Sequence, residues 1–136
     1  MFKTVLFPID QSREAREAVS VVVDVVKKYS SRLVLLSVVE PSSSPQETSG
    51  GAMSNEAAVA KLLEGAKAMF AQQGIETETL EREGQPPFII CDVADEIEAN
   101  LIIMGCRGIG LTEEGAAESV TNRVINLAPC PVLIVP

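Results

Sequence analysis

The sequence predicts an α/β protein built on one open parallel sheet with helices on both faces. Short apolar runs rich in β-branched residues alternate with longer segments whose apolar residues recur at helical spacing. The short runs are apolar at successive positions, which is typical of strands that are buried on both faces. The chain has 136 residues and no internal repeat, so we expect a single domain over residues 1–136.

The first half of the chain contains two predicted strands and two predicted helices. TVLFPI, residues 4–9, predicts a buried strand, and LVLLSVV, residues 33–39, predicts another. The apolar stripe between them, residues 15–26, predicts a helix. Residues 41–55 are dense in Ser, Pro and Gly and predict a mobile surface loop. A second stripe, residues 59–70, predicts the next helix.

The second half continues the same alternation. Residues 75–83 are polar and alternating, which favours an edge strand with one solvated face. A helix is predicted over residues 89–97 and a buried strand over residues 101–104. The apolar residues of 117–125 predict a fourth helix, and PVLIVP, residues 131–136, predicts the last strand. The order βαβαβαβαβ indicates a parallel open sheet.

Composition excludes several classes of function. The net charge of −8 argues against binding to nucleic acids or anionic membranes, because both need a basic face. No histidine is present, so the commonest general base and metal ligand is missing, and we predict no catalytic residue and no metal site. Cys91, Cys106 and Cys130 are too far apart for a zinc motif, and we interpret them as packing residues. The amino-terminal apolar run is too short for a signal peptide, which predicts a cytoplasmic protein.

Two loops carry the candidate binding chemistry. One follows the first predicted strand at residues 8–12, and the other runs from residue 105 to residue 119 after the fourth. Ligands of open α/β sheets bind beyond the carboxyl ends of the strands, where the strand order reverses. Small residues in the second loop would let backbone N–H groups approach phosphate oxygens. Gly105 and Gly108 also suit a plain turn, and Asp10 suits a plain helix start, so this pattern alone leaves both interpretations open.

The whole chain resembles the universal stress protein family. VLFPIDQS resembles the first strand of that family, and MGCRG followed by SVTNRVINLAPCPVLIV resembles its carboxyl-terminal third. The resemblance implies a five-stranded parallel sheet in the order 3-2-1-4-5, a Rossmann-like fold of the adenine nucleotide alpha hydrolase-like type. In that order, Asp10 and Gly105 lie on either side of the reversal point.

The resemblance also implies a bound adenine nucleotide, ATP or AMP, for which Mg²⁺ is a bridging option. Nucleotide-binding members carry a Gly-x-x-Gly segment, then nine residues, then Gly and Ser or Thr. Gly105, Gly108 and Ser119 match that pattern, whereas position 118 holds glutamate instead of glycine. The residues that the resemblance places at the nucleotide are Asp10, Val38, Gly105, Gly108 and Ser119. We add Pro8, Arg107 and Val120, which lie in or beside the same two loops, as further candidate binding residues.

Glu118 separates two hypotheses about function. The first is a regulatory protein of the stress response whose nucleotide-bound state is recognised by a partner protein. A negative charge about 5 Å from a phosphate costs roughly 1 kcal/mol in water and roughly 3 at an intermediate dielectric, so Glu118 weakens ATP binding without excluding it. The second hypothesis is a dimeric interaction protein in which the phosphate loop has lost its function.

The last predicted strand also predicts an assembly. PVLIVP is strongly apolar, and in the order 3-2-1-4-5 it lies at an edge of the sheet, where unpaired backbone groups invite another chain. Members of the family that this chain resembles commonly dimerise through this strand. We therefore expect a homodimer whose pairing is centred near Leu133, because Pro136 cannot donate a hydrogen bond.

Overall fold

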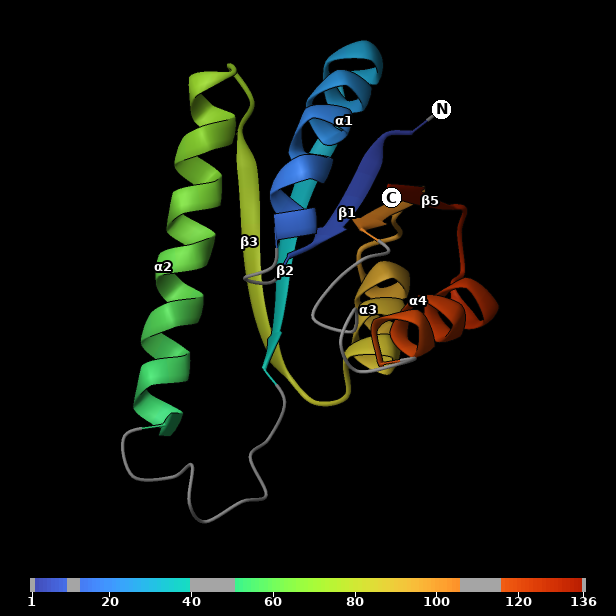
Figure 1. Cartoon of the computed structure of the whole chain (residues 1–136). Coiled ribbons are helices and arrows are strands. Elements are labelled where there is room, and N and C mark those ends of the chain that lie inside the picture. The colour runs from blue at the N-terminus through green and yellow to red at the C-terminus, as the bar shows by residue number, and fades with distance from the viewer. Residues whose placement is uncertain (1, 10–12, 40–50, 106–115, 136) are drawn as a thin grey trace.

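The computed structural model describes the backbone of residues 2–9, 13–39, 51–105 and 116–135. Five strands alternate with four helices along the chain (Figure 1). Their order and bounds are β1 Thr4–Pro8, α1 Arg13–Tyr29, β2 Arg32–Val39, α2 Gly51–Gln72, β3 Thr77–Glu83, α3 Pro86–Glu96, β4 Leu101–Gly105, α4 Ala116–Leu127 and β5 Val132–Val135. The predicted alternation of strands and helices is confirmed.

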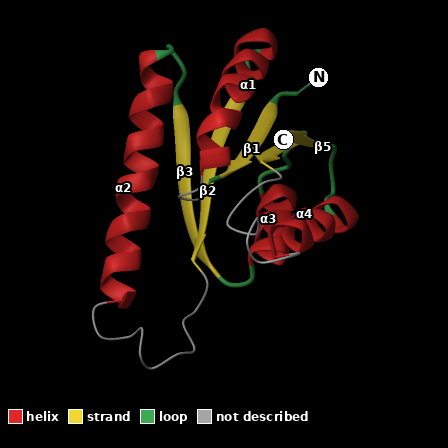
Figure 2. Cartoon of the chain, viewed as in Figure 1, coloured by secondary structure: helices red, strands yellow, loops and turns green. Residues whose placement is uncertain are grey.

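All five strands form one parallel sheet in the order β3-β2-β1-β4-β5 (Figure 2). The predicted fold class and strand order are therefore confirmed. β1 lies at the centre and its three middle residues are buried, as expected for a strand covered on both faces. β3 forms one edge of the sheet, and most of its side chains are exposed or half-buried, which matches its polar sequence.

The helices cover the sheet in two layers, each over its own apolar core. Helices α1 and α2 pack on one face, where Phe7 of β1 meets Phe70 of α2 with ring centroids 6.3 Å apart. Helices α3 and α4 pack on the other face, against Leu6, Val34 and their neighbours. Because successive side chains of a strand point to opposite faces, each central strand contributes to both cores.

Helix α2 begins earlier than the sequence predicts. The predicted loop extended to residue 55, but the helix starts at Gly51, so residues 51–55 are helical and that part of the prediction is wrong. Residues 40–50 lie outside the described residues. The physical reason is helix cooperativity: the costly step is nucleation, and each residue added to an existing helix costs only its propensity, about 1 kcal/mol or less even for Gly.

Gly84 sets the path of the chain from β3 into α3. Its φ is +147°, and its N–H donates a hydrogen bond to the carbonyl of Val39 at 2.9 Å. A Cβ at this position would lie 2.8 Å from Cδ1 of Ile89, which is closer than real Cβ atoms approach other heavy atoms. Both the backbone conformation and the space around it therefore favour glycine.

We expect Gly84→Ala to lower the free energy of unfolding by about 1–3 kcal/mol, because alanine adds strain at this φ and a clash with Ile89. Gly65→Ala is the matched control: Gly65 lies within α2 with open space around it, and alanine should raise stability there by about 0.5–1 kcal/mol. Urea unfolding followed by circular dichroism measures both. Equal stability of Gly84→Ala and the wild type would contradict the prediction.

Strand β5 forms the other edge of the sheet, as predicted. The N–H of Ile102 in β4 donates to the carbonyl of Pro131 at 3.0 Å. Because backbone groups of successive strand residues face opposite sides, those of Leu133 and Val135 also face β4. The N–H and C=O groups of Val132 and Ile134 face outward, away from the sheet.

Candidate functional site

The sheet has its topological switch point between β1 and β4. β1 pairs with β2 on one side and with β4 on the other. The helix that follows β1, α1, covers one face, and the helix that follows β4, α4, covers the opposite face. Chains that leave neighbouring strands toward opposite faces create the usual ligand position of open α/β sheets, at the carboxyl ends of those strands. We call this position the β1–β4 switch point.

The chain leaves β1 in a fixed direction. Pro8 is the last residue of β1, half-buried, and level with Leu36 of β2. The next residue, Ile9, is buried, and its N–H donates to the carbonyl of Leu36 at 2.8 Å. This bond orients the start of the loop that contains Asp10, which lies outside the described residues. In the sequence Ile9 is only the last residue of the predicted strand, and its positioning role was not predicted.

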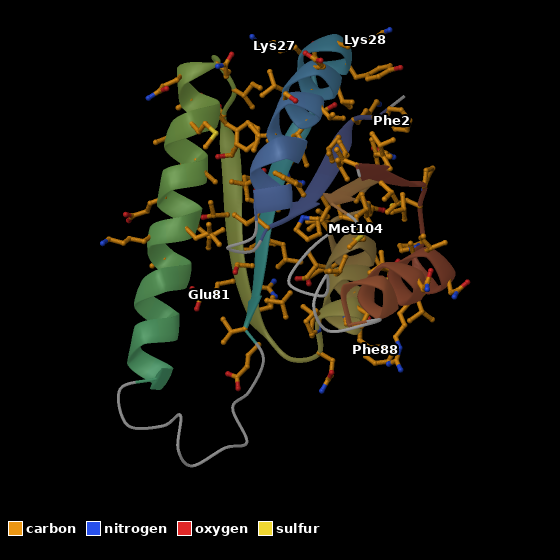
Figure 3. The ribbon with its side chains drawn as sticks, viewed as in Figure 1. Phe2, Lys27, Lys28, Glu81, Phe88 and Met104 are labelled. Atoms are coloured by element: carbon orange, nitrogen blue, oxygen red, sulfur yellow. The ribbon has the colours of Figure 1, made fainter. Side chains whose placement is uncertain are left out.

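Val38 and Met104 provide an apolar surface at the carboxyl ends of β2 and β4. Both belong to the core under α3 and α4, so their side chains lie on the same face of the sheet (Figure 3 labels Met104). Val38 is half-buried and is a predicted site residue. Met104, which is buried, was not among the predicted residues. Its place directly before Gly105 at the end of an apolar run was the available signal.

The described structure gives only part of the phosphate loop. Gly105 ends β4, half-buried and level with Val135 of β5. Arg107 and Gly108 lie outside the described residues. For Ser119 and Val120 only the backbone is described, and both lie in the first two turns of α4. The switch point thus brings Pro8, Val38 and Gly105 to the carboxyl ends of adjacent strands, and the amino end of α4 follows in sequence.

The described side chains at these strand ends are apolar. Pro8, Ile9, Val38, Val39 and Met104 carry no charge, and Arg107, the basic residue among the predicted site residues, lies outside the described residues. Binding of a phosphate group here would consequently depend on backbone N–H groups and on the amino end of a helix. The described strand ends suit the flat apolar part of a ligand.

The cysteines of the α3–α4 layer have properties of packing residues. Burial raises the pKa of the Cys91 thiol, and nearby Asp92 and Cys130 raise it further. The Cys91 sulfur also lies 3.9 Å from the carbonyl oxygen of Val124, to which its S–H donates. Burial raises the pKa of Cys130 as well. A raised pKa keeps a thiol protonated and unreactive, which agrees with the packing role predicted for both residues.

Within the described ranges, no group of three His, Cys, Asp or Glu side chains could hold a metal ion. The same ranges contain no helix that is both long and apolar enough to span a membrane.

Comparison with known proteins shows which family this chain is similar to. The profile of the universal stress protein family matches residues 1–136. A universal stress protein of Synechocystis sp. is 63% identical over 136 residues, which are 100% of this chain and 87% of that protein. The solved structure of universal stress protein UspA from Lactobacillus plantarum has 26% identity and a TM-score of 0.83, covering 99% of this chain and 98% of its own.

A third similar protein was solved with a ligand. It is a universal stress protein family protein from Arabidopsis thaliana with AMP bound, with 21% identity and a TM-score of 0.75 over 98% of this chain and 90% of that one. At this identity the likeness concerns the fold alone.

Proposed function

Because the chain belongs to the universal stress protein family, we propose that it is a homodimeric, cytoplasmic regulatory protein of the stress response that binds an adenine nucleotide, ATP or AMP. The observation that carries the nucleotide proposal is the β1–β4 switch point, where Pro8 and Gly105 end β1 and β4 and Val38 lies one residue before the end of β2. The AMP of the Arabidopsis relative supports the choice of ligand class, since that protein shares the fold.

Different residues of the chain would contact the adenine ring, the nucleoside part and the phosphates. The apolar surface of Val38 and Met104 would contact the adenine ring, and the loop that Ile9 orients would carry Asp10 to the nucleoside part. The phosphates would lie on the backbone of the loop from Gly105 through Gly108 and against Ser119 at the amino end of α4. Mg²⁺, where bound, would bridge the phosphates. A partner protein would recognise the nucleotide-bound state.

Val38→Phe tests the adenine contact. We expect it to weaken the binding of both AMP and ATP at least about tenfold, because a larger ring occupies the space that the adenine requires. Val39→Phe is the matched control, since the next residue of β2 points to the opposite face. Isothermal titration calorimetry measures the affinities, and urea unfolding verifies that both variants are folded. Unchanged affinity in folded Val38→Phe would place the adenine elsewhere.

A second candidate function is a dimeric interaction protein without a nucleotide. Glu118 favours it, because the helix begins at Ala116 and the glutamate therefore lies in the first turn of α4. A carboxylate at a helix amino end stabilises the helix dipole and repels other anions there. The ratio of absorbance at 260 and 280 nm in freshly purified protein separates the two functions. With one Tyr and no Trp, the chain absorbs weakly, so bound adenine would raise the ratio clearly.

The homodimer part of the proposal is supported by the free edge of β5. Val132 and Ile134 turn their backbone groups outward, and Leu133 lies between them with its own groups bonded toward β4. When two such strands pair antiparallel across a two-fold axis at Leu133, residue 132 of each copy meets residue 134 of the other. This arrangement makes four backbone hydrogen bonds and leaves no outward group of residues 132–134 unpaired.

A further inference from the structure

Helix α4, whose amino end the phosphates would contact, rests mainly on another helix. Of the described elements, α3 is the main neighbour of α4, and the two lie side by side in Figure 1. The structure describes the side chains of α4 from residue 122 to residue 127, and within that range Val124 alone is buried. The place of α4 on the sheet therefore depends largely on its contacts with α3.

Helix α3 is itself fixed to the sheet. Its buried side chains are Pro87, Ile90, Cys91, Val93 and Ala94. The helix packs against β2, and the N–H of Gly84, which precedes it, donates to the carbonyl of Val39 at the end of that strand. A helix with this many buried side chains and a fixed start is a firm support for the helix that packs on it.

Two contacts join α3 directly to α4. The guanidinium of Arg123 lies over the ring of Phe88, with its Cζ atom 6.0 Å from the ring centroid. Figure 3 shows Phe88 next to α4. The S–H of Cys91, three residues further along α3, donates to the carbonyl of Val124, with sulfur and oxygen 3.9 Å apart. Residues three apart lie on one face of a helix, so one face of α3 holds two consecutive residues of α4.

The contact between Phe88 and Arg123 lies at the surface. Phe88 remains 47% exposed, so its ring contributes little to the core. Arg123 is exposed as well and forms no ion pair with another residue of the described ranges. At an exposed site, a cation over an aromatic ring changes an equilibrium constant about two- to fivefold. The two side chains therefore stabilise the packing of α4 on α3.

We propose that Phe88 is a positioning residue of the nucleotide site, because it holds Arg123 and thereby sets the place of the amino end of α4. The inference rests on the proposed nucleotide function and extends that site to α3. Ser119 precedes Arg123 by four residues, which is about one turn or 6 Å along the helix. A shift of α4 at Arg123 therefore displaces the N–H groups on which the phosphates depend. The adenine surface of Val38 and Met104 belongs to the strands and stays in place.

A comparison of ATP with adenosine separates positioning from a general loss of structure. Phe88→Leu keeps an apolar side chain but removes the ring that Arg123 contacts. We expect it to weaken the binding of ATP about two- to fivefold and to leave that of adenosine unchanged, because adenosine has no phosphate to contact α4. Phe88→Tyr keeps the ring and should bind both ligands as the wild type does. Titration calorimetry measures ATP, NMR titration measures adenosine, and urea unfolding verifies that the variants are folded.

The failure of this inference is distinct from the failure of the proposed function. If the wild type binds both ligands and Phe88→Leu weakens them equally, or leaves ATP unchanged, Phe88 does not position α4 for the phosphates and the inference is overturned. A wild type that binds neither ligand overturns the proposed nucleotide function and this inference with it.

A double-mutant cycle tests whether Phe88 acts through Arg123. In an Arg123→Gln background, Phe88→Leu should cause no further loss of ATP affinity, because the contact is already absent. Lys67→Gln is the matched control, since it removes the same charge from an exposed residue of α2. In that background, Phe88→Leu should keep its two- to fivefold effect. An effect of Phe88→Leu that persists unchanged in the Arg123→Gln background overturns the inference.

Discussion

Glu118→Gly should tighten the binding of ATP by about ten- to hundredfold, and that of AMP by clearly less. The variant removes one negative charge near the phosphates, which is worth about 1–3 kcal/mol at about 5 Å. ATP gains more than AMP because it carries more charges that the carboxylate repels. Residue 118 lies in the first turn of α4, at the helix end that would hold the phosphates.

Two controls separate charge from backbone effects. Glu118→Gln removes the charge but keeps the side chain length, and it should recover most of the gain. Raising the salt concentration should reduce the difference between wild type and variant, because salt screens charges that are open to solvent. Titration calorimetry at two ionic strengths measures the affinity of wild type and of both variants for ATP and for AMP. An equal change for both nucleotides, or none, would show that the carboxylate points away from the phosphates.

The fold could be predicted from the sequence because its strongest signals are local. The central strands are mostly apolar, and every helix that packs on them has an apolar stripe, so pattern and packing agree at most positions. Met69 and Ile125, which belong to the predicted stripes, remain exposed. The start of α2 could not be predicted in the same way. Residues 51–55 have the composition of a loop, and they are helical because they extend a helix that later residues nucleate.

The candidate site was predictable in part. The strand ends that carry Pro8, Val38 and Gly105 follow from the order of the sheet, which the family resemblance supplied. The buried Met104 and the hydrogen bond of Ile9 were not predicted, because they depend on which face a side chain takes and where a carbonyl points.

The N–H groups of successive β5 residues face opposite sides of the strand, and a substitution that tests the dimer must remove one that faces outward. The N–H of Leu133 faces β4, so Leu133→Pro removes a hydrogen bond within the sheet and should loosen β5 from its own chain. The N–H of Ile134 faces outward, where proline is compatible with an edge strand. Ile134→Pro therefore removes a donor that only a second copy would use.

We expect Ile134→Pro to remain folded and to weaken the homodimer by about ten- to hundredfold. Two hydrogen bonds are lost per dimer, at about 0.5–1.5 kcal/mol each, and the proline ring adds a steric obstacle at the interface. Ile134→Ala is the matched control, because it loses the same core contacts of the side chain but keeps the N–H, and it should dimerise nearly as the wild type does. Light scattering at several micromolar concentrations compares the three proteins, and circular dichroism verifies their fold. If folded Ile134→Pro dimerises as tightly as Ile134→Ala, the outer edge of β5 does not form the interface.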